Sequence, residues 1–319
     1  MIKSLYYSLL SFAKCNYTKR INKIISILNL NNGLSLFDIG AAGQIMPRWL
    51  RIESFLNYHG FEPDDRSRSK LLRKKNGCIS YTIHDKIVSN SGNDSTLYLC
   101  KTPTNSSTLS PNKEFISLFS DSTRFDVTGT TKLPTTKIDN LNVNNIDFIK
   151  LDIQGGELNA LKGAKNSLTK VLGLEIEVEF HEIYKNQPLY CDINSFMKEN
   201  DFTFIDFPRL VRWDRDNVYQ TVGQCVWGDS LYMRTPEYMT KNISDVDTIK
   251  RYLTICLIYH RYDFINKIKT HFQEKIDPKF FHKTSVLRKR FLFSQLLKRR
   301  VNNFLNLFQF FDEEIHTLH

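Results

Sequence analysis

Residues 145–164 constrain the fold more than any other part of the sequence. They read Asn-Ile-Asp-Phe-Ile-Lys-Leu-Asp-Ile-Gln-Gly-Gly-Glu-Leu-Asn-Ala-Leu-Lys-Gly-Ala. The apolar run that ends at Asp152 predicts a buried strand, and Gly155-Gly156 then turns the chain into a helix. Glu157 falls in the first turn of that helix, where the helix dipole favours an acid. A strand, a tight turn and a helix in this order are typical of an open α/β sheet, which binds ligands at the carboxyl ends of its strands.

Short apolar runs separated by helix-length stretches continue on both sides of this segment and predict a mostly parallel sheet. The expected strands are 35–39, 59–62, 79–83, 96–99, 148–152 and 172–180, followed by extended segments at 202–207 and 222–233. Residues 192–200 have a helical pattern. Between residues 99 and 145 the chain is rich in Thr, Ser, Asn and Lys, so we expect a loop or lid there.

The two ends of the chain differ from this central part. Apolar residues at helical spacing in 2–30 and beyond Pro236 predict an N-terminal helical extension (1–33), a central domain (34–239) and a basic helical C-terminal region (240–319). The net charge is +10, of which residues 1–33 contribute +5 and residues 240–319 contribute +7. The central part therefore carries −2, which argues against an active face that binds nucleic-acid phosphates.

The C-terminal region contains two basic triplets, Arg288–Arg290 and Lys298–Arg300. On a helix the triplets share a broad polar face opposite a stripe of Leu and Phe. Such a helix either docks onto an anionic membrane or polymer, or packs against the core of its own domain. The sequence leaves both interpretations open.

Neither a signal peptide nor a membrane span is expected. The apolar stretch Leu5–Ala13 is followed by four basic residues and lacks a small-residue cleavage site. No uncharged apolar run approaches the roughly 18 residues of a span. The six cysteines show no zinc-ligand spacing and fit reduced thiols. We expect a cytoplasmic protein, with peripheral attachment to the inner membrane face as an option for the basic C-terminal region.

Two segments near the start of the central domain have the composition of a ligand site. Residues 36–43, Leu-Phe-Asp-Ile-Gly-Ala-Ala-Gly, run from a strand into small residues that let a ligand approach the backbone. They lack the second glycine of a dinucleotide motif, which disfavours nicotinamide and flavin cofactors. Glu62 ends the next strand, 24 residues after Asp38. Its carboxylate suits the two hydroxyls of a ribose, and capping of the following helix is its alternative role.

Taken together, residues 36–43, Phe61-Glu62-Pro63 and 145–164 resemble the signature of FkbM-type methyltransferases, which are S-adenosylmethionine-dependent enzymes with a Rossmann-like class I fold. The likeness spans about residues 34–233 and includes 134–141 and 177–190 in the same order. It implies an α/β fold with a mostly parallel central sheet and flanking helices, to which the helical ends are added. It also implies that residues 34–239 are a methyltransferase domain whose cofactor is S-adenosyl-L-methionine.

The resemblance assigns cofactor contacts on four segments. The methionine part is expected at Asp38, Gly40, Ala41 and Gly43, the ribose hydroxyls at Glu62, the adenine near Ile87, and a further contact at Asp152. Gln154 stands where many members carry Glu. Because a neutral amide can neither act as a base nor add charge to a metal site, catalysis is not placed on it. The sequence does not decide whether a metal is required.

Methyl transfer to a hydroxyl requires that the acceptor proton be removed as the new bond forms. The candidates for this general base are Asp152, Glu179 and His181. Three acids recur at every second residue of 175–179 and share one strand face, which either faces solvent or cations or belongs to the site.

Arginine and tryptophan side chains could bind the acceptor. Arg48-Trp49 is one such pair, and Arg209, Arg212, Trp213 and Arg215 form a second group. Aromatic faces stack on sugar rings and Arg donates to hydroxyls. The alternative for the second group is a basic surface loop with a packed Trp.

The leading functional hypothesis is an O-methyltransferase that acts on a sugar hydroxyl of a glycan or glycosylated metabolite. The alternatives are a methyltransferase of nucleic acid, protein or another metabolite, and a non-catalytic binding or scaffold protein. No nucleic-acid partner is expected, because the central part is slightly acidic and lacks a base-methylation motif. The intact Asp38, Gly40, Glu62 and Asp152 favour an enzyme over a scaffold.

Overall fold

The computed structural model describes residues 16–74, 76–141, 143, 145–215 and 223–308. The chain divides into two compact units. Among the described residues, one is an α/β unit made of residues 35–45 and 56–234, and the other is a helical unit made of residues 16–34, 46–55 and 235–308. Described residues from before the first strand and from after β11 thus belong to the same helical unit. The three-part division into 1–33, 34–239 and 240–319 stays a prediction.

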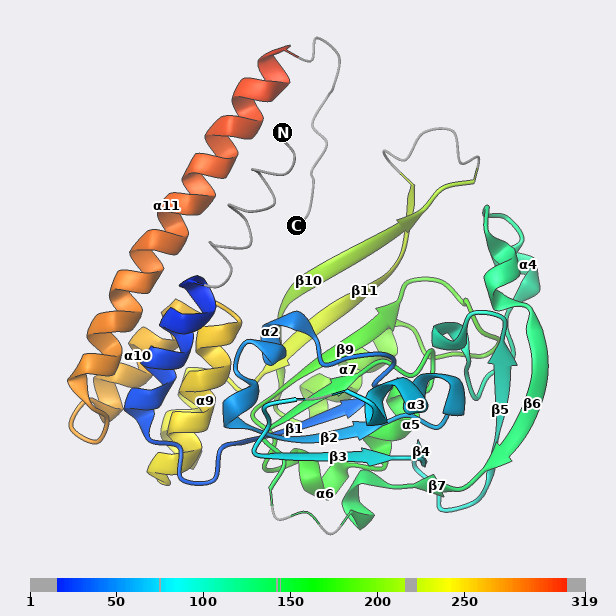
Figure 1. Cartoon of the computed structure of the whole chain (residues 1–319), viewed down its shortest axis with the longest axis horizontal. Helices are drawn as coiled ribbons and strands as arrows, with labels where there is room; N and C mark the ends of the chain where they lie inside the picture. Colours follow the sequence, from blue (N-terminus) through cyan, green and yellow to red (C-terminus); the bar gives the residue numbers. More distant parts are fainter. Residues whose placement is uncertain (1–15, 75, 142, 144, 216–222, 309–319) are drawn as a thin grey trace. The chain divides into compact units, whose positions relative to one another are not determined.

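A seven-stranded sheet forms the centre of the α/β unit (Figure 1). Across the sheet the strands are β3 (Ser80–His84), β2 (Leu56–Phe61), β1 (Leu34–Ile39), β8 (Phe148–Leu151), β9 (Gly173–Glu179), β11 (Gln224–Met233) and β10 (Thr203–Trp213). The pairs β2–β3, β1–β8 and β8–β9 are parallel, whereas β11 is antiparallel to both β9 and β10. The predicted mostly parallel sheet is confirmed.

The strand order reverses between β1 and β8. The chain moves outward from β1 to β2 and β3, and later elements continue from β8 on the other side. In open α/β sheets the crevice at the carboxyl ends of the two strands at such a reversal is the usual ligand site. The backbone N–H of Asp152, directly after β8, donates to Ile39 O at 2.9 Å. Asp38 and Asp152 therefore lie at this crevice.

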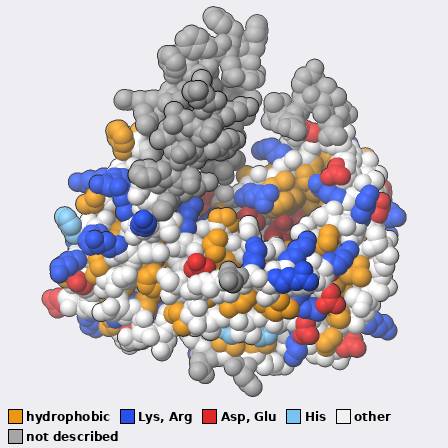
Figure 2. Space-filling view, in the orientation of Figure 1, with side chains coloured by type: hydrophobic (Ala, Val, Ile, Leu, Met, Phe, Trp, Pro, Cys, Tyr) orange, Lys and Arg blue, Asp and Glu red, His pale blue; other side chains and the backbone are white. Residues whose placement is uncertain are grey.

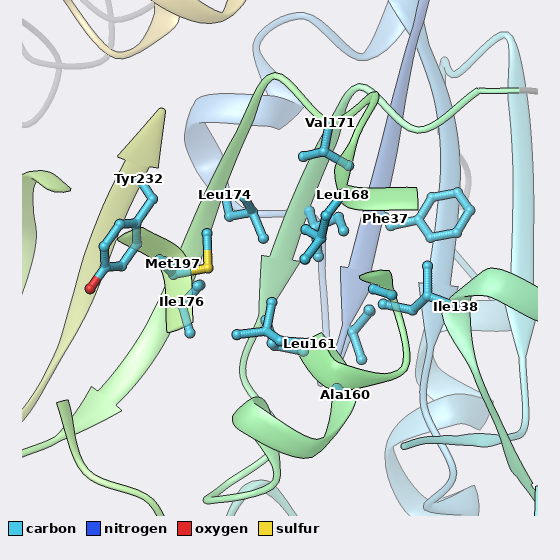
Figure 3. Close-up of a cluster of buried hydrophobic side chains, with 14 of the residues drawn as sticks. Phe37, Ile138, Ala160, Leu161, Leu168, Val171, Leu174, Ile176, Met197 and Tyr232 are labelled. Carbon is cyan, nitrogen blue, oxygen red and sulfur yellow. The ribbon is translucent and has the colours of Figure 1, made fainter. Parts of the chain in front are cut away.

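A hydrophobic cluster joins the sheet to α5 (Glu157–Lys162), α6 (Lys165–Leu168) and α7 (Tyr190–Glu199). Figure 3 shows Leu161, Leu168 and Met197 of these helices gathered around Leu174 and Ile176 of β9. All five side chains are buried. On β9 these apolar residues alternate with acids, so the strand presents one face to this core and its carboxylates to the other side.

The polar stretch 99–145 is more regular than the sequence indicated. The expected strand 96–99 is not part of the central sheet, because β5 (Ser95–Cys100) pairs with β6 (Val127–Leu133) in a separate antiparallel ribbon. The expectation of a loop is wrong for β6. Its Thr-rich sequence lies largely exposed, and a ribbon that contacts water on both sides needs no apolar alternation, while β-branched Thr favours the extended backbone.

Short elements fill the rest of this stretch and the connections around it. They are η3 (Pro103–Asn105), α4 (Lys113–Ile116), η4 (Ser122–Phe125), η5 (Ile138–Asn140), and the two-residue strands β4 (Ile87–Val88) and β7 (Thr135–Thr136), which pair in parallel. The helix α3 (Asp65–Leu72) follows β2.

The strand expected at 202–207 extends to Trp213 as β10, so Arg209, Arg212 and Trp213 lie on a strand rather than on a loop. Pro208 explains the difference, because proline cannot donate to a strand ladder and makes the run seem to end. The pairing with β11 shifts register between Asp206 and Arg209, around this proline. The extended segment expected at 222–233 is confirmed as β11 from Gln224 on, and Val222 lies outside the described residues.

The helical unit contains a helix over residues 16–25, then η1 (Ser26–Leu28), α2 (Pro47–Leu50), η2 (Glu53–Phe55), α8 (Pro236–Asn242), α9 (Val246–Ile258), α10 (Tyr262–Phe272) and α11 (Pro278–Phe308). The helical character expected of both ends is confirmed within the described residues. Among the described helices, none combines the length and the apolar character needed to cross a membrane.

Arg234, directly after β11, binds backbone carbonyls at the ends of three neighbouring segments of the α/β unit. Its buried guanidinium donates to Asn200 O at 2.6 Å, to Leu168 O at 2.7 Å and to Val171 O at 3.4 Å. The guanidinium carbon also lies 3.9 Å from the centre of the Phe202 ring. One side chain thus satisfies carbonyls at the ends of α6 and α7 and before β9.

We expect Arg234→Met to lower the free energy of unfolding by about 2–4 kcal/mol, because buried carbonyls that lose a charged donor are costly. Urea denaturation measures this loss. Lys198→Met, at an exposed position of α7, is the matched control and should change stability by about 0.5 kcal/mol or less. Equal effects of the two replacements would contradict a structural role for the Arg234 guanidinium.

Candidate active site

A cavity of about 590 Å³ opens at the carboxyl edge of the sheet, within the α/β unit. This volume is in the range of small-molecule sites. Figure 2 shows the recess with acidic side chains in its floor and hydrophobic and basic side chains around it. The lining residues that matter for chemistry are Gly40, Glu62, Ile87, Arg124, Lys150, Asp152, Gln154, Glu177, Glu179, Arg209, Trp213 and Trp227.

Lys150 joins the acids that end β1 and β8. Its Nζ lies 3.1 Å from Asp152 Oδ2 and 3.5 Å from Asp38 Oδ1, and it donates to Gly40 O at 3.4 Å. The other oxygen of Asp38 accepts from Tyr58 Oη at 2.8 Å. Burial alone would lower the pKa of Lys150, but Asp152 and Asp38 outweigh burial and raise that pKa above its usual value. Lys150 is therefore a permanent cation.

The same ion pair sets the charge of Asp152. Burial alone would raise the pKa of Asp152, but Lys150 and the hydrogen bonds around the carboxylate lower it below the usual range. Asp38 is more deeply buried, and burial raises its pKa despite Lys150 and Tyr58. Asp38 is not among the residues that line the cavity. It contacts Lys150 from behind the lining and is itself held by Tyr58.

The turn after β1 packs directly on the end of β8. Gly40 has φ +85°, and a Cβ at this position would lie 1.7 Å from Asp152 O. Only glycine fits such a backbone. The N–H groups of Gly40 and Ala41 both donate to Phe61 O at 3.0 Å. Gly40 lines the cavity, whereas Ala41 is buried and neither Ala41 nor Gly43 is among the lining residues.

Glu62 projects from the end of β2 into the same cavity. Its Oε1 accepts a hydrogen bond from Asp64 N at 2.9 Å. Burial raises the pKa of Glu62 to about 7 in spite of this bond. The alternative role of Glu62 as a helix cap is wrong, because Asp64 caps α3 by accepting from Arg66 N. Ile87 of β4 also lines the cavity, as the expected adenine contact requires.

The acids of β9 are buried, which excludes the interpretation that they face solvent. Glu175, Glu177 and Glu179 are 2%, 5% and 2% exposed. Asp229 of β11 lies opposite Glu177 in the strand pair. Burial, together with the neighbouring carboxylates, raises the pKa values of Glu177 and Glu179 well above the usual value. Glu177 and Glu179 of β9, with Asp229 beside them on β11, thus form a carboxyl row whose members hold protons at unusually high pH.

Gln154 links this carboxyl row to Asp152. Its Nε2 donates to Asp152 Oδ1 at 3.0 Å and to Glu177 Oε2 at 2.5 Å, and its Oε1 accepts from Tyr184 Oη at 2.9 Å. Ser107 Oγ donates to the backbone carbonyl of Gln154 at 2.6 Å. The residue has φ +62°, a left-handed conformation that these contacts maintain. A neutral amide here separates two carboxyl groups that would otherwise repel.

His181 is not among the residues that line the cavity. It lies two residues beyond β9, where its Nε2 is 2.9 Å from Gln224 Nε2 and its ring stacks on Phe115 with centroids 5.2 Å apart. The structure therefore brings Asp152 and Glu179 to one cavity but does not bring His181 to it. The catalytic roles of all three residues stay predictions.

Two arginine–tryptophan pairs also belong to the cavity. The guanidinium carbon of Arg209 lies 4.7 Å from the Trp227 ring centre, and that of Arg124 lies 4.7 Å from the Trp213 ring centre. All four residues line the cavity. Arg212 and Arg215 are not among the lining residues.

The other expected acceptor pair belongs to the helical unit. There Trp49 is buried with its ring edge toward Tyr259, and the Arg48 guanidinium lies over the same Tyr259 ring. These contacts account for both residues as packing partners.

Several site residues were not found from the sequence. Lys150 has the sequence pattern of an ordinary polar residue within a strand, and Tyr58, Tyr184 and Arg124 are brought to the site only by the fold.

In the described part of the chain, no group of three or more His, Cys, Asp or Glu side chains is arranged to hold a metal ion.

A family model for the methyltransferase FkbM domain matches residues 41–204, just over half of the chain. The chain belongs to the FkbM methyltransferase family. The resemblance carried by residues 36–43, 61–63 and 145–164 is therefore confirmed, and the chain contains an FkbM methyltransferase domain. The strand order described above is the Rossmann-like class I fold expected for an FkbM methyltransferase.

Solved structures with some similarity include the FkbM methyltransferase of Methylobacillus flagellatus KT, with 18% identity, a TM-score of 0.37 and coverage of 63% of this chain and 44% of that chain. Magnesium protoporphyrin IX methyltransferase of Synechocystis PCC 6803 with bound SAM has 11% identity, a TM-score of 0.34 and coverage of 69% and 80%. An rRNA methylase of Streptococcus thermophilus has 9% identity, a TM-score of 0.31 and coverage of 68% and 93%.

The match spans less than half the length of the Methylobacillus flagellatus protein. Similarities at these TM-scores say nothing about the acceptor. None of the curated proteins compared with this FkbM methyltransferase matches it.

The carboxyl row makes the stability of this methyltransferase depend on pH. Burial raises the pKa of Asp229 to about 7, and Glu175 and Asp152 add to the effect, while Arg209 and Lys150 oppose it. The folded state thus binds this proton more tightly than the unfolded state. The resulting stabilisation is complete below about pH 4, the pKa range of an unfolded Asp, and is lost as the pH rises to about 7.

Asp229→Asn removes this titration. We expect the unfolding free energy of the variant to rise relative to wild type by about 2 kcal/mol between pH 5 and pH 8. Urea denaturation at several pH values measures the difference, and the exposed Asp201, changed to Asn, is the matched control. A difference that stays constant over this pH range would mean that Asp229 is ionised throughout.

Proposed function

We propose that this FkbM methyltransferase transfers the methyl group of S-adenosyl-L-methionine to a sugar hydroxyl of a glycan or glycosylated metabolite. The observation that carries the proposal is the division of one cavity into two halves. Glu62 at the end of β2 and Ile87 of β4 define one half, and Trp227 of β11 with Arg209 and Trp213 of β10 define the other. In the sheet, β8 and β9, which carry Asp152, Glu177 and Glu179 at their ends, lie between β2 and β11. A cofactor and an acceptor in these halves would meet at the carboxyl row.

The residues of the first half fit S-adenosylmethionine. Glu62 is 6% exposed and has one oxygen bound to Asp64 N, so its second oxygen is available to ribose hydroxyls. Ile87 offers an apolar surface to an adenine ring. Gly40 lets the turn after β1 pack directly against Asp152, so that its backbone lines the cavity where the methionine part would lie. When bound, the cofactor supplies a methyl group activated on a positively charged sulfur.

Asp152 and the carboxyl row favour a bound cation. Asp152 stays ionised because Lys150 is its partner, and Glu177 and Glu179 become easier to ionise when a positive charge is near. Preorganised carboxylates also hold such a charge without reorganising during the reaction. The acids of the row therefore support binding of a sulfonium.

Among the carboxyl groups, Glu179 best fits the general base. Asp152 is held by Lys150 and Gln154 and has a lowered pKa, which makes it a weak base. Glu177 is bound by the Gln154 amide. The carboxyl group of Glu179 accepts from its own backbone N–H and has a strongly raised pKa. A carboxylate of raised pKa takes a proton more readily than an ordinary one.

The second half of the cavity supports a sugar acceptor. Trp213 and Trp227 offer aromatic faces of the kind that stack on sugar rings, and Arg124 and Arg209 offer donors to hydroxyls. The nearby buried acids disfavour a highly anionic acceptor such as a nucleic acid. A neutral acceptor with several hydroxyls meets both conditions.

Two variants test the cofactor half. We expect Glu62→Gln to weaken the binding of S-adenosylmethionine about tenfold or more, because one charged acceptor for two hydroxyls is lost. Gly40→Ala should abolish binding, because its Cβ would overlap Asp152 O. Isothermal titration calorimetry measures the affinity, with exposed Glu182→Gln as the matched control. Unchanged affinity in both variants would place the cofactor elsewhere.

Replacement of the proposed base tests the mechanism. We expect Glu179→Gln to lower kcat by about 10²–10⁴ while the affinity for the cofactor changes little. His181→Ala should retain most of its turnover, because its side chain does not line the cavity. Transfer of a labelled methyl group to a panel of neutral glycans, nucleic acids and proteins provides the assay and identifies the acceptor class. Full activity of Glu179→Gln together with inactive His181→Ala would reverse the assignment.

A further inference from the structure

The helical unit contains a second hollow, which, unlike the active site, is lined by basic side chains and no acidic ones. This groove has a volume of about 340 Å³ and lies between residues 20–24 and α11. Its lining residues are Arg20, Lys23, Ile24, His282, Lys283, Val286, Leu287 and Arg290. Four of the eight are Lys or Arg, and no acid lines the groove. None of these four cations forms an ion pair with a residue in the described part of the chain.

Beyond this groove, α11 carries large apolar side chains that are exposed to solvent. At its start the helix packs against its own unit, where Phe280, Phe281 and Leu287 are buried. Farther along, Phe293 and Leu296 are 69% and 59% exposed. Packing against the core, one of the two interpretations of this helix, therefore accounts for its described side chains up to Phe291, which stacks on His260, but not for Phe293 and Leu296.

The exposed apolar residues form one stripe with cations along it. Val286, Phe293 and Leu296 follow one another at spacings of seven and three residues, so they lie on the same side of the helix. Lys283 and Arg290 are each about one turn from Val286, and Lys289 lies between Val286 and Phe293. The basic groove is thus continuous with an apolar stripe.

We propose that this face of the helical unit docks onto an anionic lipid bilayer. A bilayer surface supplies both partners that the face lacks, because lipid phosphates match the cations and acyl chains match Phe293 and Leu296. Lys and Arg place their charged ends at the phosphates while their apolar stems lie along the lipid. The helix would lie in the plane of the membrane surface.

Other occupants fit less well. An anionic polymer offers phosphates or sulfates but nothing apolar to Phe293 and Leu296. Residues 1–15 of the chain contain two Lys and no acid, so this segment would add to the charge of the groove rather than neutralise it. Residues 312–314, Asp-Glu-Glu, could neutralise part of the charge, and a groove that they occupied would not bind vesicles.

Vesicle sedimentation with the full chain tests the proposal. We expect binding to phosphatidylcholine vesicles that contain roughly 30% phosphatidylserine, weakening as salt rises, and little binding to phosphatidylcholine alone. Lys283→Glu with Arg290→Glu should lower the partition coefficient at least about tenfold. Phe293→Ser with Leu296→Ser should lower it while the dependence on salt persists. Circular dichroism and cofactor affinity show that the variants remain folded.

The matched control is Lys165→Glu with Lys170→Glu, the same change of charge at exposed positions of the α/β unit. It should bind anionic vesicles nearly as well as wild type. Loss of binding equal to that of the groove variant would contradict the proposal, and so would equal binding to neutral vesicles or no binding to either kind. Heparin binding that is as strong as vesicle binding and unaffected by the Phe293 and Leu296 changes would assign the face to an anionic polymer instead.

Discussion

The active site depends on the ammonium group of Lys150, which lies between the carboxylates of Asp38 and Asp152 at the reversal of the strand order. Asp38 and Lys150 are in register on the parallel strands β1 and β8, so the pairing of the strands itself brings these charges together. Burying a charge costs several kcal/mol, and only a close partner and hydrogen bonds offset that cost. Tyr58 on one side and Gln154 on the other supply those bonds. The geometry of the crevice therefore follows from the need to satisfy one buried cation.

The carboxyl row of β9 and β11 has too many acids for all of them to ionise. Like charges this close share protons, and their titration belongs to the group rather than to one residue. Gln154 limits the repulsion, since a glutamate at that position would add another negative charge beside Asp152 and Glu177. On the proposed function, the positive sulfur of the cofactor would draw protons off this row. Binding of the methyl donor and activation of the base would then be one electrostatic event.

The parts of the fold and site that could be predicted from the sequence are those encoded locally. Strands β1 and β8 are largely buried and read as apolar runs, and the acids that follow such strands mark the ligand edge, as Asp152 and Glu62 do. The ribbon strand β6 was missed because its residues are polar and exposed, and β10 was cut short at Pro208. The burial of Glu177 and Glu179 could not be predicted, since it depends on β11, which lies about fifty residues later in the chain. The position of His181 outside the cavity lining could not be predicted either, because its ring contacts Gln224, which lies more than forty residues later in the sequence.

The net charge of +10 describes neither site. A ligand responds to charges within about one Debye length, about 8 Å at physiological salt. Inside the cavity, acidic and basic side chains are mixed: the charged lining residues are Glu62, Asp64, Lys86, Arg124, Lys150, Asp152, Glu177, Glu179 and Arg209. In the groove of the helical unit they are lysine and arginine alone. No residue lines both the cavity and the groove. A substitution that changes the charge of one therefore leaves the lining of the other unchanged. On the proposed function, the acceptor would be selected by the residues that line the cavity, whatever the charge of the chain as a whole.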